Sequence, residues 1–109
     1  MKPGAVIINT ARGKLIDSDA LIAGLESGKL GGAALDVLEN ENGLYYYNRM
    51  GDVIPNPELA ALRSMPNVIL TDHTAFYTEE DVESMVRGVL ESADAFAKGQ
   101  PTRHDVTNL

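Results

Sequence analysis

The stretch AVIINTARG, residues 5–13, is the most informative part of the sequence. Residues 5–8 form a short, continuously apolar run, which is typical of a strand buried on both faces of a parallel sheet. The run stops at small and polar residues, and Arg12 follows at once. Because open parallel sheets bind their ligands at the carboxyl ends of the strands, Arg12 is predicted to lie at a ligand site.

Two later runs of strand type also end at polar groups. The run AAL, residues 33–35, stops at Asp36, and the run VILT, residues 68–71, is followed closely by His73. The carboxyl ends of neighbouring parallel strands meet at one edge of a sheet. Arg12, Asp36 and His73 are therefore expected to converge on one crevice, in an arrangement typical of an active site.

The first two strands are expected to form a βαβ unit. A helix capped by Asp17 or Ser18 and ended by Gly28 lies between them. A Gly-Gly pair then leads into the second strand, which is placed around residues 33–37. The crossover of such a unit is predicted to be right-handed.

A third strand and two helices complete the expected architecture. After a long polar and aromatic loop at residues 39–56, a short helix begins at the Asn-Pro pair of residues 56–57, and a strand spans residues 67–71. The sequence TEED at residues 78–81 resembles a capping box with an acid in its last position. Apolar residues then recur with a 3.6-residue period, typical of an amphipathic helix. They are Val82, Met85, Val86, Val89, Leu90, Ala93, Phe96 and Ala97.

Composition excludes several classes of protein. The net charge of −7 argues against a nucleic-acid partner, which requires a basic surface. The chain has no cysteine, so disulfides and thiolate metal sites are excluded, and no metal is expected. No apolar stretch approaches the roughly 20 residues that span a bilayer, and the first residues do not resemble a signal peptide. We therefore expect a cytoplasmic protein without a membrane partner.

Three charged residues are candidates for chemistry, each with an ordinary alternative. Arg12 is either a surface ion-pair residue or a bidentate carboxylate ligand, and its place after a buried strand favours the second. His73 is either a hydrogen-bonded strand-end residue or a proton carrier, since its ordinary pKa of about 6.5 suits proton transfer. Glu41 is either a solvated charge or a partner that orients the His73 ring.

Two further features invite interpretation. Asp36 ends a buried strand, so its carboxylate needs a partner to offset the loss of water, and a ligand or a helix N-terminus would serve. The three adjacent aromatic residues Tyr45, Tyr46 and Tyr47 are interpreted as loop packing or an interface rather than a site.

Four segments together give the chain a family resemblance. They are NTARG (residues 9–13), GGAALDVLE (31–39), MPNV (65–68) and HTA (73–75). In this order and spacing they resemble the NAD-dependent D-2-hydroxyacid dehydrogenases, and HTAFYT at residues 73–78 is most similar to the D-lactate dehydrogenase branch. The chain departs from many members at Asp72, where they have proline.

The resemblance implies an α/β fold that is the C-terminal half of a Rossmann-like parallel-sheet dinucleotide-binding domain, followed by a long C-terminal helix. Residues 1–78 would be a partial NAD-binding domain. Residues 79–109 would be a helix and tail that return to the substrate domain of a longer enzyme. The chain has no glycine-rich G-x-G-x-x-G turn, so it is expected to be a fragment in which Met1 is an internal methionine.

The resemblance also implies roles for particular residues. Arg12 matches the residue that binds the substrate carboxylate, His73 matches the acid/base that protonates the carbonyl oxygen, and Glu41 matches the partner of that histidine. The residues expected to contact NAD are Thr10, Ala11, Arg12 and Asp36.

The implied activity is hydride transfer between NADH and a small 2-oxo acid, with pyruvate and D-lactate as the expected pair. The alternative is a non-catalytic folding or interaction module derived from the same family. An apolar stripe on the last helix is costly to leave exposed, so this helix is expected to pack on its own sheet or on another copy. A homodimer is the favoured assembly.

Overall fold

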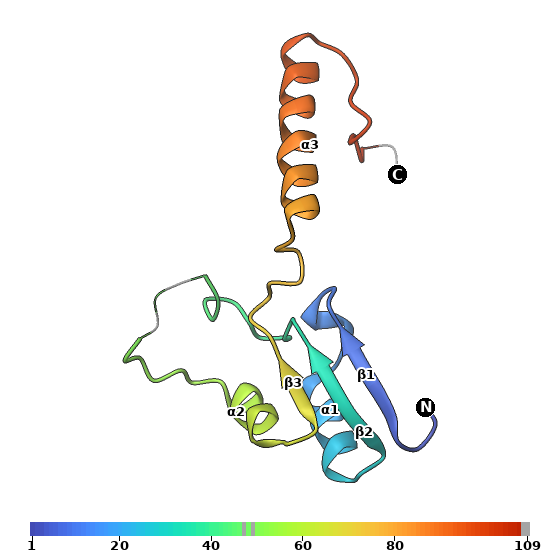
Figure 1. The fold of residues 1–109 in the computed structure, drawn as a ribbon, viewed down its shortest axis with the longest axis vertical. Helices are drawn as coiled ribbons and strands as arrows, with labels where there is room; N and C mark the ends of the chain where they lie inside the picture. The colour runs from blue at the N-terminus through green and yellow to red at the C-terminus, as the bar shows by residue number, and fades with distance from the viewer. Residues whose placement is uncertain (47, 49, 108–109) are drawn as a thin grey trace. The chain divides into compact units, whose positions relative to one another are not determined.

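The computed structural model describes residues 1–46, 48 and 50–107. Its sheet has three parallel strands in the order β1 (Ala5–Asn9), β2 (Leu30–Leu35) and β3 (Val68–Leu70) (Figure 1). The chain forms two compact units, Met1–Ala75 and Phe76–Leu109. The expected parallel α/β sheet is confirmed, and the whole sheet belongs to the first unit.

The helix predicted between the first two strands is α1 (Ser18–Glu26), preceded by one 3₁₀ turn at Gly13–Leu15. Asp17 is its N-cap, because the side chain of Asp17 accepts a hydrogen bond from the N–H of Ala20 over 2.8 Å. Gly28 follows the helix with a φ of 74°, a left-handed conformation that glycine adopts without strain.

The predicted second strand, residues 33–37, is wrong at both ends. The strand β2 begins at Leu30, so the Gly-Gly pair lies inside it, and it ends before Asp36. A β-carbon at Gly31 would lie 2.5 Å from the carbonyl oxygen of Gly4, and one at Gly32 would lie 2.7 Å from that of Asn67. Glycine therefore allows the neighbouring backbones to approach the middle strand at this end of the sheet.

The predictions for the rest of the first unit are closer to the structure. The helix α2 (Pro57–Ser64) begins where predicted, and the side chain of Asn56 accepts a hydrogen bond from the N–H of Leu59 over 2.9 Å. The strand β3 is one residue shorter at each end than the predicted span 67–71.

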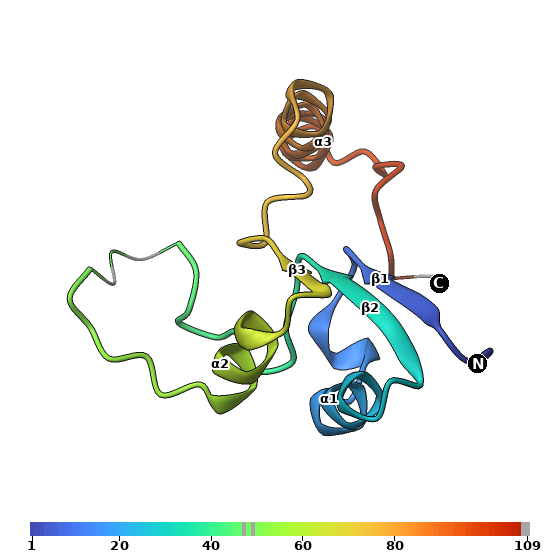
Figure 2. The same ribbon diagram turned by 60° about the horizontal axis from the view of Figure 1, so that its bottom comes forward.

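The core of the first unit lies on one face of its sheet, which both α1 and α2 cover (Figures 1 and 2). Its buried members are Leu21, Leu25, Leu30, Ala33, Leu35, Leu38, Leu59 and Leu62. The opposite face is open within this unit, since the exposed fractions of Val6, Ile8 and Ile69 are 62%, 72% and 67%. The prediction that the first strand is buried on both faces is therefore wrong for this unit, because the two helices pack on the same side.

The second unit is dominated by α3 (Glu79–Ala97). Thr78 caps it, since its hydroxyl accepts a hydrogen bond from the N–H of Asp81 over 3.1 Å. The reciprocal half of a capping box is not formed, because the N–H of Thr78 donates to the carbonyl oxygen of Phe76. No side chain of α3 is buried, and most of its apolar stripe is exposed. Among the described residues, no helix combines the length and the apolar character that a membrane span requires.

Candidate active site at the carboxyl ends of the strands

Asp36 is the anchor of the site. It follows β2, is only 4% exposed, and uses both carboxylate oxygens. Its Oδ1 accepts hydrogen bonds from the Thr71 hydroxyl (2.5 Å) and the Thr74 N–H (2.9 Å). Its Oδ2 accepts one from the N–H of Ala75 (2.9 Å). The carboxylate therefore ties the turn after β3, which carries His73, to the end of β2.

These partners offset the loss of water at the buried Asp36 carboxylate. Thr71 and the turn around His73 supply them, rather than the helix N-terminus that the sequence analysis offered as one alternative, and the other alternative, a ligand, stays a prediction. Burial raises the pKa of Asp36, but the hydrogen bonds from Thr71, Ala75 and Thr74, together with the nearby His73, outweigh burial. The pKa of Asp36 consequently lies below its ordinary value of 3.8.

Glu41 and His73 form the central pair of the site. The Oε1 atom of Glu41 lies 2.9 Å from Nδ1 of His73, and both side chains are partly exposed. The other carboxylate oxygen of Glu41 accepts a hydrogen bond from the N–H of Leu38 over 3.0 Å, which fixes the carboxylate on its own loop. The pair orients the imidazole ring and leaves Nε2 as the ring nitrogen for another partner.

Two tyrosines next to this pair were missed as site residues by the sequence analysis. The ring of Tyr45 meets the His73 ring edge-on, with centroids 6.5 Å apart. The Tyr46 ring lies 6.0 Å from the same ring, and its hydroxyl donates a hydrogen bond to the His73 carbonyl oxygen. Tyr47 lies outside the described residues. The run of adjacent aromatic residues was the signal available in the sequence. A contact between residues 27 positions apart cannot be read from the local spacing of residue types.

The end of β1 lies beside the end of β2, because the N–H of Asp36 donates to the carbonyl oxygen of Asn9 over 2.9 Å. The Asn9 side chain accepts from the N–H of Ala11 (3.1 Å) and donates to the carbonyl oxygen of Arg12 (3.0 Å), so it fixes the turn. Thr10, Ala11 and Arg12 are exposed.

The Arg12 guanidinium donates a hydrogen bond from Nη1 to the carbonyl oxygen of Ala11 over 2.7 Å. Within the part of the chain that the structure describes, no ion pair involves Arg12. The structure brings Glu41 and His73 together and ties Asp36 to the turn after β3, which carries His73. It gives no hydrogen bond from Arg12 to Glu41 or His73 among the described atoms.

A cavity of about 340 Å³ lies beside the two tyrosines, in the first unit. Its lining residues are Leu44, Tyr45, Tyr46, Ile54, Leu59, Arg63, Asp72 and Thr74. Burial, then the charges of Asp72 and Glu41, raise the pKa of Tyr45, against the opposite effect of Arg63. Asp72, one of the lining residues, thus brings a negative charge near Tyr45.

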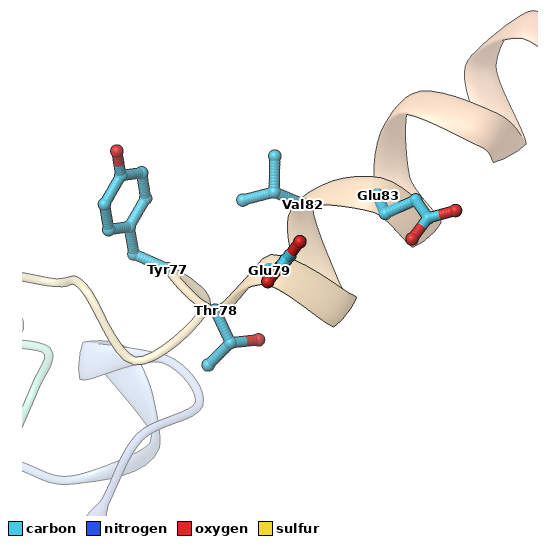
Figure 3. A pocket seen from close by; sticks show the side chains of 5 residues that line it. All are labelled: Tyr77, Thr78, Glu79, Val82 and Glu83. Carbon is cyan, nitrogen blue, oxygen red and sulfur yellow. The ribbon is translucent and has the colours of Figure 1, made fainter.

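A hollow of about 510 Å³ lies at the start of α3, in the second unit (Figure 3). It is lined by Tyr77, Thr78, Glu79, Val82 and Glu83, and none of the predicted site residues is among them. Two carboxylates and no cation line this hollow, so it does not suit an anionic 2-oxo acid. Over residues 1–46, 48 and 50–107, no cluster of three or more His, Asp or Glu side chains could hold a metal ion.

The parallel sheet, with its polar groups at the carboxyl ends of the strands, has the layout of part of a dinucleotide-binding domain, and the comparison with known families agrees. Residues 1–75 match the family described as D-isomer specific 2-hydroxyacid dehydrogenase, NAD binding domain. The chain belongs to this family.

Several proteins and solved structures of known name are similar to this chain. The chain is 51% identical over 96 residues to an aromatic 2-oxoacid reductase of Clostridium sporogenes, covering 88% of this chain and 29% of that protein. It is 47% identical over 100 residues to a D-specific alpha-keto acid dehydrogenase of Enterococcus faecium, covering 92% and 31%.

A solved structure of the NAD-complexed D-isomer specific 2-hydroxyacid dehydrogenase from Lactobacillus delbrueckii ssp. bulgaricus superposes with a TM-score of 0.83 at 40% identity. That comparison covers 94% of this chain and 31% of the other. The chain therefore spans less than a third of the length of each of these three proteins.

Proposed function

We propose that this chain is the C-terminal part of an enzyme that reduces a 2-oxo acid to a D-2-hydroxy acid with NADH. The Glu41–His73 pair carries the proposal, because 2.9 Å between a carboxylate and Nδ1 leaves Nε2 oriented for proton transfer. The strand-end position of Arg12, close to the end of β2, supports it by offering a cation for the substrate carboxylate.

The residues at the ends of β1 and β2 fit a dinucleotide. Thr10, Ala11 and Arg12 present an exposed backbone turn at the carboxyl edge of a parallel sheet, where such cofactors bind. The Oδ2 atom of Asp36 accepts one hydrogen bond within the chain and, as a carboxylate oxygen, can accept another. We propose that Thr10, Ala11, Arg12 and Asp36 contact NAD, which when bound supplies the hydride.

In the proposed reaction, the side chains of this chain handle the substrate and the proton. Arg12 binds the substrate carboxylate through the planar fork of its guanidinium and so orients the adjacent carbonyl. His73 donates the proton on Nε2 to the carbonyl oxygen as it becomes a hydroxyl, and accepts it in the reverse direction. Glu41 holds the ring through Nδ1 and fixes its orientation.

We propose pyruvate as the first substrate to test. The C. sporogenes relative is named for aromatic 2-oxo acids, so phenylpyruvate is the informative second substrate. A higher kcat/KM for pyruvate would place this protein with the lactate-forming branch. A higher kcat/KM for phenylpyruvate would make phenylpyruvate, rather than pyruvate, the proposed substrate.

We also propose a domain division, an assembly and a cellular location for the complete enzyme. Residues 1–78 form part of the NAD-binding domain, and residues 79–109 return to a substrate domain in the complete enzyme. The assembly is a homodimer, which the exposed apolar stripe of α3 supports. The location is the cytoplasm, which fractionation of cells would test.

The proposed function is tested by two substitutions in the full-length protein. His73→Ala should lower kcat by about 10²–10⁴-fold, the usual contribution of a positioned acid/base. Arg12→Lys should raise KM for pyruvate and lower kcat, because an ammonium cannot form the two-point contact. Arg87→Lys is the matched control, since Arg87 is an exposed residue of α3 paired with Glu83.

The outcomes separate the two hypotheses. NADH oxidation by wild-type protein with pyruvate or phenylpyruvate, lost in His73→Ala and retained in Arg87→Lys, supports the enzyme. A full-length protein that oxidises no NADH with any 2-oxo acid would favour the non-catalytic module instead.

A further inference from the structure

Among the described residues, two that are not glycine have a left-handed backbone, and they contact each other. The φ angle is 66° at Tyr46 and 55° at His73. This conformation is unfavourable for a residue with a β-carbon, and it persists where surrounding contacts hold it. The Tyr46 hydroxyl donates a hydrogen bond to the main-chain oxygen of His73 over 2.5 Å. Two strained residues from distant parts of the sequence are thus joined by one hydrogen bond.

Burial does not account for the conformation of Tyr46. Its exposed fraction is 69%, so little of the ring is removed from water by packing. Its ring is tilted by 49° against the His73 ring, with centroids 6.0 Å apart. The contacts that this strained residue makes with His73 therefore explain its conformation better than the core does.

Other residues hold the chain that follows His73 and the Nδ1 atom of its ring. The carboxylate of Asp36 accepts the N–H groups of Thr74 and Ala75, which fixes the chain that follows His73. Glu41 holds the ring through Nδ1. These contacts do not reach the main-chain oxygen of His73, which is the atom that Tyr46 binds.

We propose that Tyr46 is a positioning residue for His73. Its hydroxyl fixes the peptide group that carries the imidazole, and with Glu41 on Nδ1 this sets the direction of Nε2. The proposal rests on the proposed function, in which His73 exchanges the proton. In the proposed reaction, Tyr46 acts through His73 and contacts neither substrate nor cofactor.

The experiment compares Tyr46→Phe with Tyr45→Phe in the full-length protein. Both substitutions keep an aromatic ring and remove one hydroxyl. The ring of Tyr45 also touches that of His73, edge-on at 6.5 Å, but the hydroxyl of Tyr45 makes no described hydrogen bond to His73. Tyr45→Phe is therefore a matched control for the loss of the Tyr46 hydroxyl.

Two measurements are made on each variant. The first is the set of imidazole ¹H–¹⁵N signals of His73, assigned by their loss in His73→Ala. The second is the kcat and KM for pyruvate reduction. Tyr46→Phe should shift or broaden the His73 signals and lower kcat about 10-fold with the KM for NADH unchanged, because small misplacement of a reacting group is costly. Tyr45→Phe should change neither.

Either of two results would overturn the positioning role. One is a Tyr46→Phe protein with the His73 signals and kcat of the wild type, and the other is an equal effect of the two substitutions. If the wild-type protein reduces no 2-oxo acid, the proposed function fails. The His73 signals then still decide whether Tyr46 holds the imidazole.

Discussion

A β-carbon on Gly13 would lie 2.0 Å from the carbonyl oxygen of Leu38. Gly13 directly follows Arg12, and the N–H of Leu38 donates to the carboxylate of Glu41. The close approach of the two backbones thus joins the turn that carries Arg12 to the loop that carries Glu41. Only glycine allows this distance, because the contact is with rigid backbone rather than with the end of a flexible side chain.

Gly13→Ala is therefore expected to destabilise the protein and separate two parts of the proposed site. Overpacking of this kind costs about 1–3 kcal/mol, and here the upper end is expected. Urea unfolding should show a lower midpoint, and kcat/KM for the 2-oxo acid should fall with it.

Gly24→Ala is the matched control for Gly13→Ala. The added β-carbon would meet the side chain of Leu30 at 2.9 Å, which can shift, and alanine is a better helix former than glycine by about 1 kcal/mol. A Gly13→Ala protein as stable and as active as the Gly24→Ala protein would contradict the proposed link between the two loops.

Asp36 should make stability depend on acid pH. Its pKa is lower in the folded protein than the ordinary 3.8, so folding favours the charged form. The stabilisation is fully present above the unfolded pKa and is lost as the pH falls through the lower, folded pKa. Asp36→Asn should cost about 1.5–3 kcal/mol at neutral pH, because charged hydrogen bonds to the His73 turn are lost.

The check is a series of urea unfolding curves between neutral and acid pH. The difference between wild type and Asp36→Asn should shrink below pH 4, where the wild type also loses its carboxylate charge. Glu26→Gln, a change of an exposed carboxylate at the end of α1, controls for net charge. A difference that is constant over the whole pH range would be incompatible with this role of Asp36.

Glu41→Gln should lower kcat about 10–100-fold, the usual effect of losing a partner that orients a reacting imidazole. The amide keeps nearly the same shape but replaces the carboxylate that holds Nδ1 of His73 by a weaker, neutral acceptor. Glu39→Gln is the control in the same loop, since Glu39 accepts a hydrogen bond from the N–H of Ser18 rather than from His73. Equal rates for wild type and Glu41→Gln under saturating substrate would remove Glu41 from the proposed mechanism.

The positions of the strands and the helix caps could be predicted because they depend on local sequence. Apolar runs that stop at polar groups located all three strands, and Asp17, Asn56 and Thr78 cap their helices through hydrogen bonds within three residues. The start of β2 could not be predicted, because glycine normally weakens a strand. Close approach of neighbouring backbones favours glycine in the structure, and this depends on the tertiary fold.

The site was predictable in part for the same reason. Asp36 and His73 stand at strand ends, so the sequence could indicate that they lie near one another. The partners of Asp36 and the contact between Tyr46 and His73 depend on left-handed backbone at residues other than glycine. No propensity favours this conformation for tyrosine, so a sequence pattern cannot indicate it.

The chain of residues 1–109 on its own is expected to bind NADH weakly and to lack dehydrogenase activity. The glycine-rich turn that places the pyrophosphate at a helix N-terminus is not among these residues. Fluorescence titration with NADH and a pyruvate reduction assay would check both statements. Turnover at about 1 s⁻¹ or more, the lower range for enzymes, would refute the expectation.

The exposed stripe of α3 leads to a prediction about assembly. Met85, Val86, Val89 and Leu90 are all exposed within their unit. Burying each large apolar side chain is worth about 1.5–3 kcal/mol, so a second copy that covers this stripe would be stabilised. We expect the chain of residues 1–109 on its own to be a dimer in sedimentation equilibrium, and Val86→Lys to shift it towards the monomer. Ser84→Lys adds the same charge to the opposite face of the helix and should leave the dimer intact. A compact monomer at high concentration, or equal dissociation by the two lysines, would show that this stripe does not join two copies.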